Sequence, residues 1–218
     1  MSERRSRQNN SFATLRQFIR ERAPVETCEM CSLRLAAGHQ HLIEPVSRKL
    51  ICACDACAIL FGSQGETKYR RVPRRIRSLP DFRLSAAQWD GLMIPIGLAF
   101  FYNSTPDERV IALYPSPAGP TESLLGLESW AEIVNANPLL KGLEPDVEAL
   151  LVNRVGEGRG PSEPEYYLVP IDECYKLVGL IRTHWRGLSG GAAVWGEIKK
   201  FFADLRRRST VVREASHA

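Results

Sequence analysis

The chain has 218 residues, of which 44% are hydrophobic and 25% are charged. A chain of this length can bury a core as one large domain, or as a small domain joined to a medium one. The longest apolar stretch, residues 91–102, is too short to cross a bilayer, and residues 1–12 lack the apolar segment of a signal peptide. These features exclude a membrane span, and we expect a soluble, cytoplasmic protein.

The net charge of +4 is distributed unevenly along the chain. Residues 1–80 contain 15 Lys and Arg against 7 Asp and Glu, and residues 81–218 contain 14 against 18. The resulting balance of +8 and −4 predicts two functional units. We expect the following divisions: an N-terminal tail and helix over 1–23, a cysteine-rich metal-binding module over 24–62, a basic connector over 63–80, an α+β domain over 81–208 and a disordered tail over 209–218.

The cysteine-rich module begins after Pro24, which ends a helix predicted over residues 11–22. Five of the six cysteines in the chain lie between positions 28 and 57. Close-spaced cysteine pairs in a chain without a leader are typical of metal ligands, whereas disulfide frameworks spread their cysteines more widely. We therefore expect a metal site.

Two C-x-x-C motifs supply the predicted ligands, which are Cys28, Cys31, Cys54 and Cys57. Two such motifs place four sulfurs around one tetrahedral ion, and zinc is the ion that most often takes this set. Residues 41–53 fit a β-hairpin that returns the chain to the first motif, and a helix can start after Asp55. This order predicts a small zinc-ribbon or treble-clef-like module.

The sequence also allows other ligands and another metal at this site. Cys52 precedes Cys54 by two residues and can replace one of the four, and His39 and His41 are further candidate ligands. Iron also binds four thiolates, either as a single ion or as an iron–sulfur cluster. Rubredoxin motifs usually carry glycine after the second cysteine, and Ser32 and Ala58 stand there instead, which favours zinc over iron.

The second half predicts an antiparallel sheet with amphipathic helices. Apolar runs at 96–104 and 109–116, separated by the turn-like residues 105–108, read as a β-hairpin, and a second strand pair is expected at 146–155 and 165–171. We expect a stiff loop over 114–123. Short helices are predicted at 85–92 and 128–136, followed by two longer helices whose apolar faces are Cys174, Leu177, Val178, Ile181 and Trp185, and Val194, Ile198, Phe201, Phe202 and Leu205.

Two further motifs are candidate sites. Residues 187–191 match G-x-S-x-G around Ser189, but a helix rather than a strand precedes them, so a turn between helices is expected. The connector contains a dense group of arginines that can steer an acidic partner or contact nucleic acid. We assign partner binding to five of them: Arg70, Arg71, Arg74, Arg75 and Arg77.

The order of motifs along the chain resembles an uncharacterised bacterial family whose members are often encoded beside uptake nickel–iron hydrogenase genes. The motifs that carry the resemblance are CEMC, GHQHL, ICACDACAILF, WDGLMIPIGLAFF, ALYPSPAGPTES, DVEALLVNR, YYLVPIDECYKLVGLIRTHWRG and EIKKFF. They extend over about residues 12–208. The resemblance implies an accessory role linked to a hydrogenase and carries no established activity.

The expected function is therefore that of a non-catalytic, zinc-binding accessory protein that contacts a hydrogenase subunit or a maturation factor. No paired carboxylates, catalytic triad or phosphate-binding loop is evident in the sequence. The alternatives are an electron-transfer protein with an iron–thiolate centre at the same cysteines, and a nucleic-acid-binding regulator that uses the basic connector.

Overall fold

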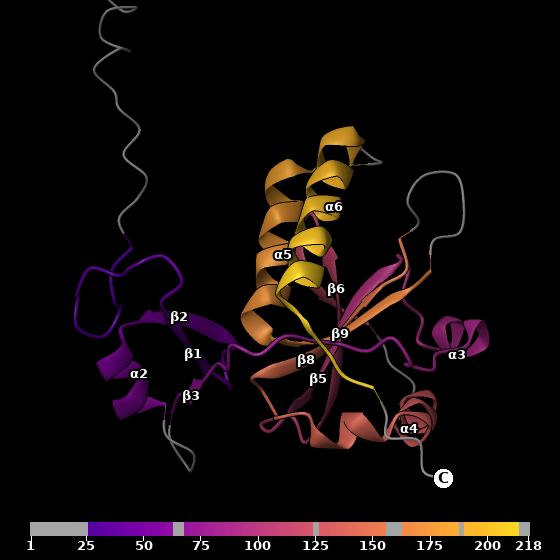
Figure 1. Ribbon diagram of the computed structural model, residues 1–218, viewed down its shortest axis with the longest axis horizontal. Helices are drawn as coiled ribbons and strands as arrows, with labels where there is room; N and C mark the ends of the chain where they lie inside the picture. Colours follow the sequence, from indigo (N-terminus) through magenta and orange to yellow (C-terminus); the bar gives the residue numbers. More distant parts are fainter. Residues whose placement is uncertain (1–25, 63–67, 124–126, 156–162, 188–189, 214–218) are drawn as a thin grey trace, which may run out of the picture.

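The computed structural model describes residues 26–62, 68–123, 127–155, 163–187 and 190–213, which form a mixed α+β protein with two sheets (Figure 1). The helix predicted over residues 11–22 lies outside the described residues, as does Ser189. Within the described part of the chain, no helix is both long enough and apolar enough to span a membrane.

The N-terminal module is a small antiparallel sheet with one short helix. Its strands are β1 (Gln40–Glu44), β2 (Lys49–Ala53) and β3 (Arg70–Arg71), in the order β2-β1-β3, and α2 (Asp55–Phe61) follows β2 almost directly. The first two strands form the predicted hairpin, in which Gln40 lies opposite Ala53 and Glu44 opposite Lys49. The sequence therefore runs from a cysteine turn through a hairpin to a helix, as the motif spacing predicts.

The larger domain is built on a seven-stranded sheet. Its strands have the order β10-β4-β9-β8-β5-β6-β7, and all neighbours are antiparallel except β10 and β4. The strands are β4 (Arg77–Ser78), β5 (Leu98–Ser104), β6 (Arg109–Ser116), β7 (Gly119–Glu122), β8 (Glu148–Asn153), β9 (Glu165–Pro170) and β10 (Thr210–Val211). Both predicted strand pairs, β5 with β6 and β8 with β9, are confirmed.

Successive residues of a strand point to opposite faces of the sheet. Both faces carry apolar residues here, and helices cover both of them. Phe100 of β5 packs in the core beneath α5 (Ile171–His184) and α6 (Gly191–Arg208), whereas Phe101 packs in the core on the other face. That second face is covered by α3 (Ala86–Gly91), α4 (Leu127–Ala136) and the 3-10 helix η1 (Pro138–Gly142) (Figure 1).

The two long helices bury the apolar faces that their periodicity predicts. In α5 the buried residues include Cys174, Leu177, Val178 and Ile181, and in α6 they are Val194, Ile198, Phe201, Phe202 and Leu205. Both sets belong to one core together with residues of β5, β6, β8 and β9. The helix pair therefore stabilises the sheet by apolar burial, at roughly 25 cal/mol per Å² of apolar surface.

The N-terminal module packs against the larger domain. Ile43 of β1 and Val72 are buried in the core beneath α5 and α6. Arg48, in the turn between β1 and β2, pairs with Asp107 at 3.0 Å and with Glu122 at 3.3 Å. The module is thus joined to the domain by apolar burial and by ion pairs.

Three segments differ from the sequence-based expectation. The connector contributes β3 to the small sheet and β4 to the large one, and Thr210–Val211 forms β10 where a disordered tail was expected. The loop expected over 114–123 contains β7, which pairs with β6. Gly119 has a φ of 130° and its carbonyl accepts a 2.9 Å hydrogen bond from the Ser116 hydroxyl, so a tight turn returns the chain despite its prolines.

Candidate metal centre

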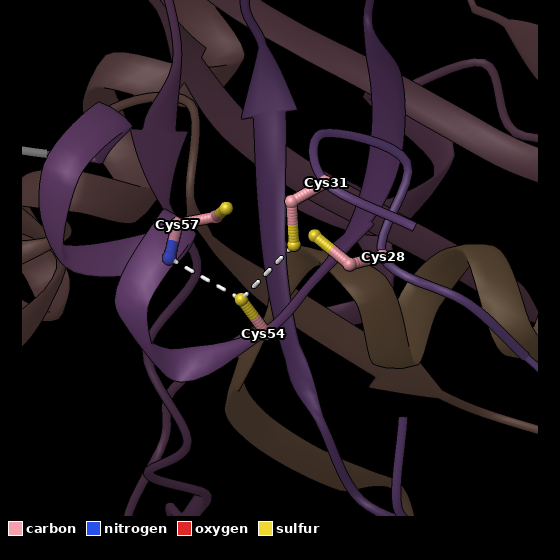
Figure 2. Close-up of side chains that lie close together, drawn as sticks. All are labelled: Cys28, Cys31, Cys54 and Cys57. Atoms are coloured by element: carbon pink, nitrogen blue, oxygen red, sulfur yellow. Dashed lines mark hydrogen bonds between the residues drawn. The ribbon is translucent and has the colours of Figure 1, made fainter. Parts of the chain in front are cut away.

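Four cysteine side chains converge at one end of the N-terminal module (Figure 2). Cys28 and Cys31 lie on the turn that precedes β1, Cys54 follows β2, and Cys57 lies in the first turn of α2. Their sulfur atoms all lie within 4.8 Å of one another. The Cys31 and Cys54 sulfurs are 3.7 Å apart, which matches the edge of about 3.8 Å expected for a tetrahedron with 2.3 Å zinc–sulfur bonds. This cluster can bind a metal ion.

The first turn is held by backbone hydrogen bonds and by one residue in a left-handed conformation. The Cys28 amide donates to the Leu33 carbonyl and the Ser32 amide donates to the Cys28 carbonyl, both at 2.8 Å. Ser32 has a φ of 63°, a region that favours glycine. A serine therefore takes the backbone conformation that glycine usually supplies after the second cysteine of such a turn.

The second turn coincides with the start of α2. Cys54 is the N-cap of this helix, and its sulfur accepts a hydrogen bond from the Cys57 amide at 3.5 Å. The Cys54 carbonyl accepts a bond from the Ala58 amide at 2.9 Å. A sulfur that caps a helix in this way has a fixed position, because the helix itself orients it.

The thiols of Cys28 and Cys57 differ strongly in acidity. Burial opposes ionisation of Cys28, but hydrogen bonds from the backbone of Cys54, Met30 and Cys31 more than compensate and lower its pKa from 9.0 to about 6. Burial, together with hydrogen bonds from the other cysteines, raises the pKa of Cys57 to about 12. The Cys28 thiolate therefore forms easily and the Cys57 thiol resists ionisation, as expected for a cluster that needs a cation to hold several negative charges.

A small core of its own surrounds the cluster. Cys28, Cys54 and Cys57 are buried together with Leu42, Ile51, Ala53 and Ala58, while Cys31 is exposed. Four protein ligands within such a core leave no coordination position for a substrate. The chemistry of this donor set is therefore suited to a structural ion or to electron transfer.

The other three candidate ligands lie apart from this cluster. His39, His41 and Cys52 form a second group, with one potential ligand atom from each within 4.8 Å of the others. Cys52 belongs to this second group and is not one of the four converging sulfurs. Cys174 lies on α5 and is fully buried in the core that this helix covers, as expected for a residue that only packs.

The five arginines assigned to partner binding contact polar groups of the same chain. Arg70 pairs with Asp146 at 2.8 Å, while Arg75 and Arg77 both pair with Glu148, at 2.7 and 3.0 Å. Arg71 contacts the Gln40 side chain at 3.3 Å, and Arg74 donates to the Gly38 carbonyl. Arg71 and Arg74 are the two of the five that are exposed and make no ion pair with these buried carboxylates. Partner binding by these arginines stays a prediction.

Sequence reasoning missed two features. The first is Asp172, which contacts His41 from a position 131 residues further along the chain. The second is a hollow of about 980 Å³ lined by residues of β9, β10 and α6, including Tyr166, Trp195 and Phe202. It shares no lining residue with either cysteine group. Neither feature has a local sequence signal, because each is assembled from distant segments.

The fold and the site together define a class: an α+β protein with an antiparallel sheet and an N-terminal four-cysteine centre that can bind a metal ion. The chain belongs to the DUF5947 family, a family of unknown function, whose family model matches residues 27–209. The matched region begins just before the first cysteine turn and ends after α6. No match was found among curated proteins or among solved structures.

Proposed function

We propose that this chain is a zinc-binding accessory protein whose four-cysteine centre holds Zn²⁺ as a structural ion. The convergence of Cys28, Cys31, Cys54 and Cys57 carries this proposal. Zinc would take the four sulfurs in the tetrahedral arrangement that it prefers. Its binding would fix the hairpin and α2, since a module of this size has few other buried groups to stabilise it.

The module's role is to present a surface to a protein partner. We propose that this partner belongs to a nickel–iron hydrogenase system, as a subunit or a maturation factor. The resemblance of the motifs to proteins encoded beside such genes supports this assignment. A centre with four protein ligands also favours a binding role over a catalytic one, since it offers no open coordination position.

Metal analysis of aerobically purified full-length protein tests the first part of this proposal. Zinc bound to thiolates is colourless, so the expected sample contains zinc and shows no visible absorbance. A coloured sample that contains iron would contradict the zinc assignment.

The partner contact is tested with a double variant, Arg71→Glu with Arg74→Glu. These two arginines are chosen because reversing Arg70, Arg75 or Arg77 would place a negative charge beside a buried carboxylate and unfold the protein. We expect the double variant to lose a co-purified hydrogenase-system protein at low salt, because charge steering acts over about 10 Å at 0.1 M salt. Retention of the partner would rule out a role for these arginines. Recovery of nucleic acid in place of protein would favour the regulator alternative.

One observation favours a second candidate function, electron transfer through iron. Ser32 adopts the left-handed conformation that glycine supplies in rubredoxin-like turns, so the absence of glycine there does not prevent this backbone geometry. Four thiolates bind iron as well as zinc. Reversible one-electron reduction of purified protein, followed by its visible absorbance, distinguishes this candidate from a zinc protein.

A further inference from the structure

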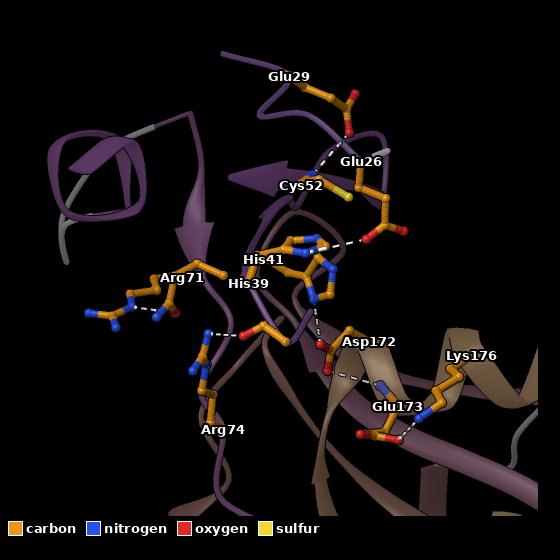
Figure 3. Close-up of polar contacts among 12 residues, drawn as sticks. Glu26, Glu29, His39, His41, Cys52, Arg71, Arg74, Asp172, Glu173 and Lys176 are labelled. Carbon is orange, nitrogen blue, oxygen red and sulfur yellow. Dashed lines mark hydrogen bonds and ion pairs between the residues drawn. The ribbon is translucent and has the colours of Figure 1, made fainter. Parts of the chain in front are cut away.

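A second group of metal-ligand side chains lies on the opposite face of the β1–β2 hairpin from the four cysteines. It consists of His39, His41 and Cys52, with one potential ligand atom from each within 4.8 Å of the others (Figure 3). His41 lies directly opposite Cys52 in the strand register. His39 lies directly before β1, and the centroid of its ring is 4.8 Å from the centroid of the His41 ring.

Alternation along the two strands separates this group from the four-cysteine centre. Leu42, Ile51 and Ala53 point into the small core that surrounds Cys28, Cys54 and Cys57. The intervening residues point the other way, and Ile43 of that face is buried in the core of the larger domain. The group of His39, His41 and Cys52 therefore lies where the module meets the larger domain.

The His39 residue is partly buried, and one nitrogen atom of its ring is unused. Its side chain is 8% exposed, and among the described residues its Nε2 atom has no hydrogen-bond partner. Its Nδ1 atom lies 3.2 Å from the Ala36 carbonyl and 3.4 Å from a Glu26 carboxylate oxygen. These acceptors favour the proton on Nδ1, which leaves the lone pair on Nε2. A buried lone pair without a partner is costly, and a metal ion would satisfy it.

His41 is oriented in the way that metal-binding histidines usually are. Its Nδ1 atom lies 2.7 Å from Oδ2 of Asp172, in the first turn of α5. The other oxygen of that carboxylate accepts a 2.9 Å hydrogen bond from the Glu173 amide. A carboxylate that holds Nδ1–H leaves Nε2 of the same ring free to bind a metal, and such outer contacts typically accompany metal-ligating histidines.

We propose that His39, His41 and Cys52 form a second metal site that binds one divalent transition-metal ion of the zinc type. Two imidazoles and one thiolate are ligands that Zn²⁺ and Co²⁺ accept. Three protein ligands leave a fourth position to water or to an exogenous ligand. The side chain of His41 is 30% exposed and Cys52 is partly buried, so the group lies close to the protein surface. Asp172 acts as a positioning residue and ties the bound ion to α5.

This site differs in kind from the four-cysteine centre. Sites with three protein ligands and one open position are the form that zinc takes where it activates water or polarises a substrate. The second site therefore provides a place for chemistry or for a small anionic ligand, which the closed centre lacks. Its location also makes the contact between module and domain dependent on metal.

Zinc titration of the full-length chain, stripped of metal by a chelator under reducing conditions, tests the proposal. The wild type should bind about two zinc ions per chain, one at each site. The variants His39→Ala and Cys52→Ala should each bind about one, because the four-cysteine centre is intact. His184→Ala and Cys174→Ala are matched controls from outside both groups, and each should bind as the wild type does.

Cobalt supplies a second readout with a direct signature. The difference between the Co²⁺ spectra of the wild type and of Cys52→Ala should contain a thiolate-to-cobalt absorption band. Asp172→Ala should still bind both ions at saturation, but the affinity of the second site for its ion should fall by roughly 10- to 100-fold. Competition with a chromophoric chelator measures this affinity.

If the wild type is saturated by a single zinc ion, the proposal of a second site is wrong, whether or not the variants fold. The proposal that the four-cysteine centre binds zinc would not be affected by that result. Binding of two ions by Cys52→Ala and His39→Ala, equal to the wild type, would overturn the second site as well.

Discussion

At the residue scale, the proposed metal centre consists of four cysteine sulfurs that lie within 4.8 Å of one another. We predict that Cys28→Ser, Cys31→Ser, Cys54→Ser and Cys57→Ser will each remove most of the zinc bound at this centre, because a hydroxyl is a much poorer zinc ligand than a thiolate. Metal analysis after dialysis against a weak chelator measures the loss. Cys174→Ala is the control, since this thiol is fully buried in a separate core.

The same experiment separates Cys52 from Cys54. Cys52→Ser should leave the zinc of the four-cysteine centre in place, because its side chain lies with His39 and His41. Loss of that ion in Cys52→Ser, combined with its retention in Cys54→Ser, would show that the ligand set has been assigned wrongly.

Ser32 supplies a second prediction at the residue scale. Its φ of 63° costs a residue with a Cβ roughly 1–2 kcal/mol, and glycine removes this cost at the expense of a more flexible unfolded chain. We predict that Ser32→Gly stabilises the metal-bound protein by up to about 1 kcal/mol, measured by thermal or denaturant unfolding. Ser47→Gly, at an exposed turn residue without positive φ, should destabilise it. Equal destabilisation by both variants would contradict the strain assigned to Ser32.

At the scale of elements, the connector is fixed to β8 by a buried carboxylate. Glu148 of β8 is fully buried, and it accepts hydrogen bonds from Arg75, from Arg77 and, at 3.1 Å, from the Glu144 amide. Burial opposes its ionisation, but these donors outweigh burial and hold the pKa of Glu148 below its ordinary value of 4.5. The charged form is therefore the one that stabilises the fold.

We predict that Glu148→Gln costs about 3 kcal/mol at neutral pH, since removing one partner leaves two arginines without their buried counter-charge. A depressed pKa in the folded state contributes stability that is complete above pH 4.5 and is lost as the pH falls through the folded value. The difference in unfolding free energy between wild type and variant should therefore be largest near pH 7 and shrink below pH 4.5.

Denaturant unfolding at several pH values measures this difference. Glu144→Gln is the matched control, because its carboxylate pairs with Arg75 at the surface and is 40% exposed. It should cost well under 1 kcal/mol. A difference for Glu148→Gln that does not change with pH would mean that the carboxylate is not charged in the folded protein.

Periodicity and turn residues predict most elements of the large domain correctly. The strand pairs β5–β6 and β8–β9 and the helices α5 and α6 follow from patterns within short windows of sequence. The short strands β3, β4, β7 and β10 do not, because two to four residues are too few to show alternation. Of these, β3, β4 and β10 pair with strands that lie far away in the sequence, which local patterns cannot reveal, whereas β7 pairs with the preceding strand β6 across a tight turn.

At the scale of the whole molecule, metal should stabilise the N-terminal module more than the seven-stranded domain. The small core around the cysteines has few apolar residues, whereas two large cores cover both faces of the sheet in the domain. Structural zinc supplies roughly 10–16 kcal/mol in small metal-dependent modules. We predict that a strong chelator unfolds the module first and leaves β5, β6, β8 and β9 intact.

Hydrogen exchange of the full-length protein, with and without the chelator, measures this effect. Amides of β1, β2 and α2 should lose protection when the metal is removed, and those of the central strands of the large sheet should keep it. Unchanged protection in the module would show that its apolar contacts alone are sufficient, and uniform loss would show that module and domain unfold as one unit.

The sequence predicts only the part of the candidate site whose ligands lie close together along the chain. The two C-x-x-C motifs and the hairpin between them are sufficient to bring four sulfurs together. The assembly of His39, His41 and Cys52 depends on strand register, and the contact of His41 with Asp172 depends on how the module packs against α5. Tertiary contacts of that kind leave no local pattern in the sequence.

X-ray absorption at the zinc edge identifies the atoms that bind the ion in the four-cysteine centre. The sample is zinc-loaded Cys52→Ala protein, in which the second site is disabled and the four-cysteine centre is complete. We predict a shell of four sulfurs at about 2.3 Å around one zinc ion. A shell that contains nitrogen or oxygen in place of sulfur, or a protein that retains iron and no zinc, would contradict it.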